Sequence, residues 1–151
     1  RIWAILVGID GYSQFPLRGC VADALAMEEY LADDLLVPRE RIQILLGPRN
    51  HSDTVTDVSS LPSHANILSL LFSDPIIIFL AGHGSRYPLS DHDDDEDDCL
   101  PKFVEVFCPI DRGTPDSSGV PIPSITDREL NTILSQISRT KELRITVILD
   151  C

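Results

Sequence analysis

Residues 3–9 have the sequence WAILVGI, and Asp10 and Gly11 follow them directly. A short continuous apolar run that ends in turn-forming residues is typical of a strand buried on both faces of a parallel sheet. Further apolar runs of strand length occur at 41–46, 75–80 and 144–149. The first run therefore predicts a buried strand, and the other three predict further strands.

The segments between these runs have the periodicity of helices. Apolar residues recur near helical spacing in three segments, which predicts helices at 21–36, 62–72 and 126–138. Thr126 and Glu129 have the spacing of a capping box at the start of the last helix. We expect a polar, acidic loop from 81 to about 102, then a strand-like piece at 103–108 and a loop at 109–123.

Strands that alternate with helices predict an α/β fold with a mostly parallel sheet. The 151 residues are enough for one domain, which we expect to span 1–151. In such sheets ligands bind at the carboxyl ends of the strands. The places to look for chemistry are therefore the ends of the strands at 3–9, 75–80 and 144–149.

The chain contains 24 acidic and 12 basic residues, giving a net charge of −12. This acidity disfavours nucleic acid as a partner, and no apolar run is long enough to cross a membrane. Seven of the acids lie in the segment 91–98, so much of the charge is local. The four cysteines are widely spaced, which indicates reduced thiols and a cytoplasmic location. Both ends look like cuts through a longer protein, so a removed leader segment stays an open alternative.

Two strand ends carry residues that are suited to catalysis. His83 follows one predicted strand between Gly82 and Gly84, and imidazole is the side chain best suited to move protons near neutral pH. Asp150 and Cys151 follow another strand, so a thiol and an imidazole would meet at one sheet edge as nucleophile and base. Each residue also has a structural interpretation, His83 as a loop histidine and Cys151 as a small buried apolar side chain.

A third strand end leads into the segment 17–23, LRGCVAD, which places Cys20 and Asp23 at the start of the first predicted helix. Taken alone, Asp23 there only complements the helix dipole. Six ordered segments together resemble the caspase-like fold of cysteine proteases, in particular metacaspases and the caspase-domain proteins of fungi. They are AILVGI at 4–9, LRGCVAD at 17–23, ANIL at 65–68, FLAGHG at 79–84, CPID at 108–111 and ILDC at 148–151.

The resemblance implies a caspase-like three-layer sandwich, of which this chain is the large-subunit portion only. It implies a cysteine endopeptidase with peptide or protein substrates, in a family linked to proteolysis and apoptosis. His83 would be the catalytic histidine, and the Gly84 backbone N–H would help to hold the oxyanion. Cys20, Asp23 and Asp150 would line a substrate pocket that selects Arg or Lys.

The resemblance leaves two placements for the nucleophile. The family's strand typically ends in Asp, then a small residue, then the catalytic Cys. We favour Asp150 as the pocket aspartate and Cys151 as the small residue, with the nucleophile as the next residue of a longer chain; the fragment by itself is then inactive. The alternative is that Cys151 is itself the nucleophile. Ala81 departs from the family, which commonly has Ser at that position.

The expected chemistry requires no cofactor, with calcium as an optional one. The acidic run lacks the spacing and central Gly of an EF-hand loop, so we interpret it as a solvated loop. Only Asp127 looks like a counterpart of the calcium acids of metacaspases, and we assign no metal ligand. Two other functions remain as alternatives: a catalytically incomplete caspase-like module that scaffolds or regulates a partner, and a nucleotide- or phosphoryl-binding domain, which would lack any phosphate-binding loop.

Overall fold

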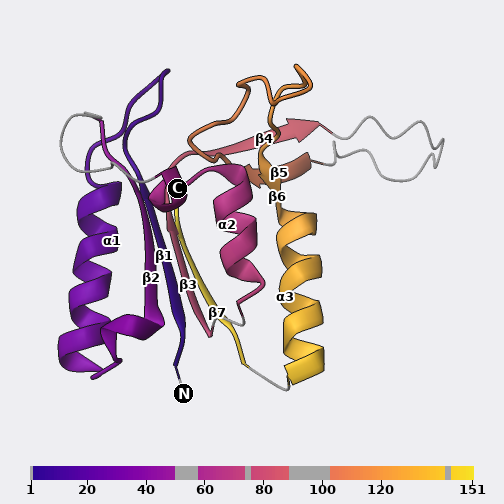
Figure 1. Cartoon of the computed structure of the whole chain (residues 1–151). Coiled ribbons are helices and arrows are strands. Elements are labelled where there is room, and N and C mark those ends of the chain that lie inside the picture. The colour runs from indigo at the N-terminus through magenta and orange to yellow at the C-terminus, as the bar shows by residue number, and fades with distance from the viewer. Residues whose placement is uncertain (1, 50–57, 74–75, 89–102, 142–143) are drawn as a thin grey trace.

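The computed structural model describes residues 2–49, 58–73, 76–88, 103–141 and 144–151, and its centre is a four-stranded parallel sheet. The strands lie in the order β2-β1-β3-β7 (Figure 1). Their bounds are β1 Ala4–Ile9, β2 Ile42–Gly47, β3 Ile77–Ala81 and β7 Thr146–Asp150. In the register of the sheet Gly8 pairs with Ala81, and Ala81 pairs with Asp150. The strand ends that carry the candidate residues therefore meet at one edge.

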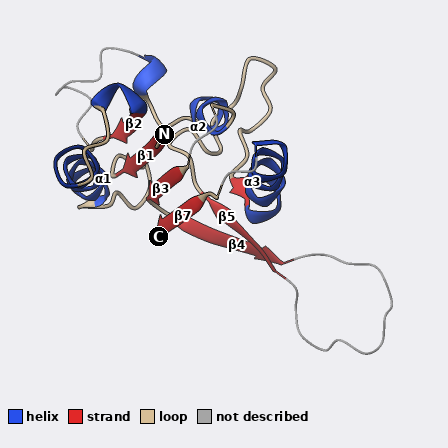
Figure 2. Ribbon diagram, turned by 90° about the horizontal axis from the view of Figure 1, so that it is seen from below, coloured by secondary structure: helices blue, strands red, loops and turns tan. Residues whose placement is uncertain are grey.

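Helices cover both faces of this sheet. Figure 2 shows α1 (Cys20–Glu29) on one face and α2 (His64–Leu71) and α3 (Asp127–Lys141) on the other. Short 3₁₀ turns span Arg39–Arg41 and Val58–Ser60. The predicted α/β class and the three layers of the caspase-like sandwich are confirmed. No helix in the described ranges is both long enough and apolar enough to cross a membrane.

The apolar run of β1 serves two cores, one on each side of the sheet. Ile5 and Val7 pack in the core that contains Ile67 of α2, while Leu6 packs in the core that contains Ala24 of α1. All five side chains are at most 1% exposed. Successive side chains of a strand point to opposite faces, so a strand covered on both faces must be apolar at every position. This requirement explains the uninterrupted run.

The first helix differs from its prediction at its C-terminal end. The α-helix stops at Glu29 and continues as a π-helix over Tyr30–Asp34, whereas the periodicity predicted an α-helix to 36. The Val37 N–H donates to the Leu31 carbonyl at 2.9 Å, and Leu36 has a positive φ of 54°. The left-handed conformation of Leu36 turns the chain back on the helix and buries Val37, which is 4% exposed. The helix therefore ends before residue 36.

A second, antiparallel sheet was not predicted. Residues 84–88 were expected in a loop but form β4 (Gly84–Pro88), which pairs with β5 (Phe103–Phe107) and, through it, with β6 (Ile125–Thr126). The sequence GSRYP of β4 has no apolar alternation, so only its partner strand makes it a strand. The acidic run at 91–98 and Cys99 lie outside the described residues.

Asp10 joins the end of β1 to the start of α1. Its carboxylate accepts the Cys20 N–H at 3.0 Å and the Gly19 N–H at 3.4 Å, while Gly19 at the N-cap has no side chain to do so. Strand and helix also touch at Gly8, where a Cβ would lie 2.4 Å from the Cys20 carbonyl oxygen. These contacts fix the first turn of α1 beside the edge of the sheet.

We predict that Asp10→Ala lowers the free energy of unfolding by about 0.5–2 kcal/mol, because two helix N–H groups lose their acceptor. Urea denaturation measures the change. The control is Asp33→Ala, which removes an exposed carboxylate paired with Arg39 and should cost less than about 0.5 kcal/mol. Equal losses for the two variants would contradict the capping role.

Candidate active site

His83 is held in place by Tyr12, from the loop after β1. The Tyr12 hydroxyl accepts the His83 backbone N–H at 2.9 Å and donates to the Cys108 carbonyl at 2.8 Å. The two rings lie 4.6 Å apart, centroid to centroid. Gly82 makes room for the hydroxyl, since a Cβ there would lie 2.5 Å from it. Burial raises the pKa of Tyr12 well above its usual range, so the hydroxyl keeps the proton that it donates.

A backbone carbonyl orients the imidazole of His83. Its Nε2 atom lies 2.6 Å from the carbonyl oxygen of Phe15. A carbonyl oxygen can only accept, so Nε2 carries a proton, and none of the described residues makes a hydrogen bond to Nδ1. Phe15 presents this oxygen from a left-handed conformation, with φ of 55° and its own side chain 79% exposed. The histidine is therefore a base whose second nitrogen is already anchored.

Cys151 lies beside Gly84 rather than in hydrogen-bond contact with His83. A Cβ built on Gly84 would lie 3.2 Å from the Cys151 Sγ atom, so the Cys151 side chain packs against the Gly84 backbone. Within the described ranges, no hydrogen bond joins this thiol to His83. Burial and the neighbouring Asp150 raise the pKa of the Cys151 thiol. Its surroundings therefore favour the thiol over the thiolate that a nucleophile needs.

Carboxylates from three elements surround Cys20. Burial, and after it the charges of Asp10, Asp150 and Asp23, together raise the pKa of its thiol to about 11. Asp10 follows β1, Asp23 lies in the first turn of α1, and Asp150 ends β7. The structure thus places Cys20, Asp23 and Asp150 in one acidic neighbourhood. A cation placed there would relieve the repulsion between the carboxylates.

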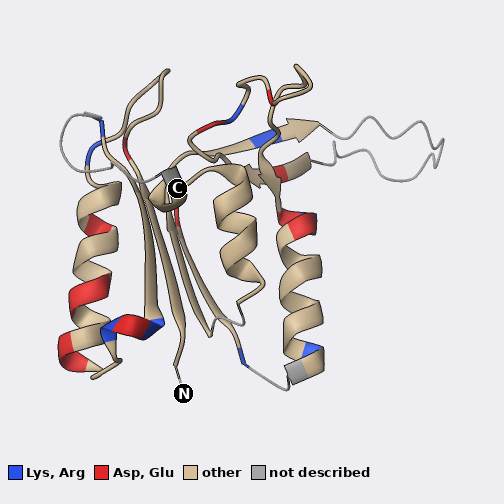
Figure 3. Cartoon of the chain, in the orientation of Figure 1, with Lys and Arg blue, Asp and Glu red and all other residues tan. Residues whose placement is uncertain are grey.

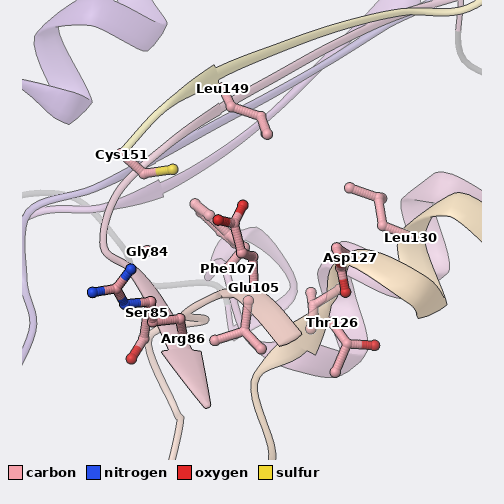
Figure 4. A pocket seen from close by; sticks show the side chains of 12 residues that line it. Gly84, Ser85, Arg86, Glu105, Phe107, Thr126, Asp127, Leu130, Leu149 and Cys151 are labelled. Atoms are coloured by element: carbon pink, nitrogen blue, oxygen red, sulfur yellow. The ribbon is translucent and has the colours of Figure 1, made fainter. Parts of the chain in front are cut away.

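Two pockets lie beside Cys151 and His83, and neither is lined by Cys20, Asp23 or Asp150. The edge pocket, of about 420 Å³, lies between the end of β7, the small sheet and α3 (Figure 4). Cys151, Leu149, Glu105, Arg86 and Asp127 are among its lining residues. The histidine pocket, of about 630 Å³, is lined by residues 12–15, 83–85, 108–110 and 112–114. Gly84 and Ser85 border both pockets, so the Gly-His-Gly segment separates them.

Sequence reasoning missed three residues of this site, Asp10, Tyr12 and Phe15. Tyr12 and Phe15 lie 71 and 68 positions from His83 in the chain, and both bonds involve at least one backbone group. Neither residue belongs to a recognisable spacing motif, although the turn after β1 marked the region. Among the described residues, no three His, Cys, Asp or Glu side chains gather as a metal site.

A model of the metacaspase, peptidase C14 domain family matches residues 3–151. The chain belongs to the metacaspase family. The Metacaspase-1A of Aspergillus oryzae is 33% identical over 117 residues, which cover 72% of this chain and 25% of the relative. The Metacaspase-1B of Aspergillus niger is 30% identical over 156 residues, covering 97% of this chain and 31% of the relative.

The resemblance of the sequence motifs to metacaspases is therefore confirmed, and the similar proteins include fungal metacaspases. The metacaspase domain spans about a quarter to a third of the length of these curated relatives. Peptidase C14 is a family of cysteine proteases, which are hydrolases acting on peptides or proteins. In such a protease, the residues of this domain that we expect to bear on catalysis and substrate binding are His83 and the acidic residues around Cys20.

We predict that iodoacetamide modifies Cys20 about tenfold more slowly than a free thiol at pH 8. A pKa of about 11 lowers the thiolate fraction, and the greater nucleophilicity of a more basic thiolate offsets part of this loss. Asp23→Asn should lower the pKa of Cys20 and speed the reaction, whereas Asp33→Asn, an exposed carboxylate elsewhere, should not. Mass spectrometry of the Cys20 peptide over time measures the rates. An unchanged rate in Asp23→Asn would show that this carboxylate does not act on the thiol.

Proposed function

We propose that this metacaspase domain belongs to a cysteine endopeptidase that cleaves after Arg or Lys by acyl transfer. The observation that carries the proposal is the fixed imidazole of His83. Its Nε2 is anchored on the Phe15 carbonyl, which leaves Nδ1 as the ring nitrogen that can accept a proton, and His83 follows β3, the strand that pairs with β7. A base with one nitrogen anchored, on a segment that follows the strand next to β7, suits activation of a thiol.

The proposed nucleophile is the residue after Cys151. The raised pKa of Cys151 and its position against Gly84 argue against this thiol as the attacking group. Successive side chains alternate along extended backbone, so the next residue would return to the side of Asp150. In the alternative, Cys151 would have to turn away from Gly84 toward His83.

In the proposed reaction, the thiol gives its proton to Nδ1 of His83, and its sulfur attacks the carbonyl carbon of the peptide. The Gly84 N–H helps to hold the oxyanion. When the C–N bond breaks, Nδ1 returns the proton to the leaving amine, and a thioester remains. Water then attacks the thioester with His83 as base, which releases the acid and restores the thiol.

The acidic neighbourhood of Cys20 supports the proposed specificity. Asp23 and Asp150 come from different elements and both act on the same thiol, so a side chain bound beside it meets two carboxylates. Arg engages carboxylates bidentately and should bind at least as well as Lys. An acidic side chain would be repelled from the same place.

A catalytically incomplete module that scaffolds or regulates a partner is the second candidate. It is favoured by one observation, namely that no thiol within the described ranges bonds to His83. Determining the residue after Cys151 in the parent protein separates the two functions. Cys followed by His-Ser-Gly supports the protease, and any other residue at the first position supports the module.

We predict that, in an extended chain with an intact nucleophile, His83→Ala lowers kcat/KM for peptide hydrolysis by at least about 100-fold. The loss arises because the thiol and the leaving amine lose their proton carrier. His64→Ala is the matched control, since His64 begins α2 and borders neither pocket. A loss much smaller than 100-fold in His83→Ala, measured with a fluorogenic peptide, would contradict the assignment.

We also predict that the extended chain cleaves Arg and Lys peptides and rejects Asp peptides. Asp23→Asn should reduce turnover of the Arg peptide by about tenfold, because one carboxylate of the pocket loses its charge. Asp33→Asn, which changes an exposed carboxylate of the π-helix, should leave turnover unchanged. A preference for Asp, or unchanged Arg turnover in Asp23→Asn, would disprove the acidic pocket and leave the protease assignment standing.

A further inference from the structure

The histidine pocket differs in charge from the rest of this acidic chain. Arg112 is the one Arg or Lys among the described residues that line it, and no Asp or Glu is among them. Figure 3 marks a basic position on β4 and both basic and acidic positions on the loop before β6, while the charged positions of α1 are acidic. Asp10, Asp23 and Asp150 are absent from the lining of the pocket. The histidine pocket is therefore lined by a cation without an acid, whereas the edge pocket is lined by Arg86, Glu105 and Asp127.

Neighbouring groups hold the guanidinium of Arg112. Its Nη2 donates to the Tyr87 hydroxyl, and its Nη1 donates to the Cys108 Sγ atom at 3.1 Å. The guanidinium carbon also lies 5.7 Å from the centroid of the Tyr87 ring. Cys108 is buried, and its carbonyl accepts a hydrogen bond from the Tyr12 hydroxyl that also holds the His83 backbone. Arg112 and His83 are therefore both positioned through Cys108. A side chain held in this way loses little freedom when a ligand binds.

Arg112 has no ion-pair partner within the described ranges, and the carboxylate of the adjacent Asp111 accepts the His64 N–H instead. No carboxylate there comes within ion-pair distance of it, although Arg39 pairs with two. A guanidinium has five N–H donors, and the contacts to Tyr87 and Cys108 leave donors free for a carboxylate. The pocket, at about 630 Å³, is large enough to take a short peptide segment.

We propose that the histidine pocket binds the leaving side of the peptide substrate and that Arg112 selects Asp or Glu at the first or second residue after the cut bond. The inference rests on the proposed protease function. In that function His83 gives its proton to the leaving nitrogen, so the leaving segment must pass His83. The edge pocket on the other side of Gly84 contains both Arg86 and two acids, so it offers no comparable preference.

The first test uses the full-length protein that contains this chain and peptide pairs with Arg before the cut bond. Each pair differs only by Glu or Gln at the first or second residue after it. We expect kcat/KM to be about threefold to fivefold higher for Glu, the range of a partly exposed ion pair. Arg112→Gln should bring the ratio to about one, and Arg112→Lys should keep part of it.

Arg86→Gln is the matched control, because Arg86 stacks on Phe103 and borders the edge pocket. It should leave the ratio of Glu to Gln peptides unchanged. Thermal unfolding of the Arg112 variants tells a lost charge from a lost fold, and Arg112→Lys retains the charge if Arg112→Gln does not fold. A ratio near one in the unmodified protein, or the same ratio in Arg112→Gln, would overturn the proposal.

The second test measures binding without turnover. A product-side peptide, Glu-Ala-Ala amide with a free amino terminus, is titrated into the same proteins and compared with Gln-Ala-Ala amide. Tighter binding of the Glu peptide that Arg112→Gln removes, and that high salt weakens, supports the proposal. Equal binding of the two peptides overturns it. If no peptide is cleaved, the protease function fails, and this binding result still decides the role of Arg112.

Discussion

The hydroxyl of Tyr12 is the point on which the arrangement of the site depends. It accepts a hydrogen bond from the His83 backbone and donates one to the Cys108 carbonyl, so one oxygen ties together the segments after β1, β3 and β5. The tie requires Gly82, where a Cβ would displace the oxygen. Because Phe15, on the same loop as Tyr12, anchors the imidazole, the loop that positions the histidine backbone also orients its ring.

The apolar core of the domain and the charged residues of the site lie in different parts of the fold. The sheet and its helices bury apolar side chains on both faces, and the polar residues stand where the strands end. The carboxylates around Cys20 oppose ionisation of its thiol and together favour a cation bound beside it. The Asp10 carboxylate caps α1, while Asp23 and Asp150 are exposed and open to a ligand.

The strands at 4–9, 42–47, 77–81 and 146–150 lie within two residues of their predictions. For β1 and β3 the reason is that burial demands apolar residues at each position of a covered strand, whereas β7 keeps its apolar run although it is largely exposed. The capping box of α3 was also readable, and the Glu129 N–H donates to the Thr126 hydroxyl at 3.0 Å. The strand β4 was missed because its polar sequence acquires strand structure only by pairing with β5.

The sequence alone determined that the chain is an α/β domain, that His83, Cys20, Asp23 and Asp150 stand at strand or helix ends, and that six ordered motifs match metacaspases. These features are local, because they depend on periodicity and on spacing within short segments. Tertiary structure decided which nitrogen of His83 is free, where Cys151 lies, and that Arg112 shares a pocket with His83. Each of these depends on contacts between residues far apart in the chain, and many of the contacts involve backbone atoms that carry no sequence signal.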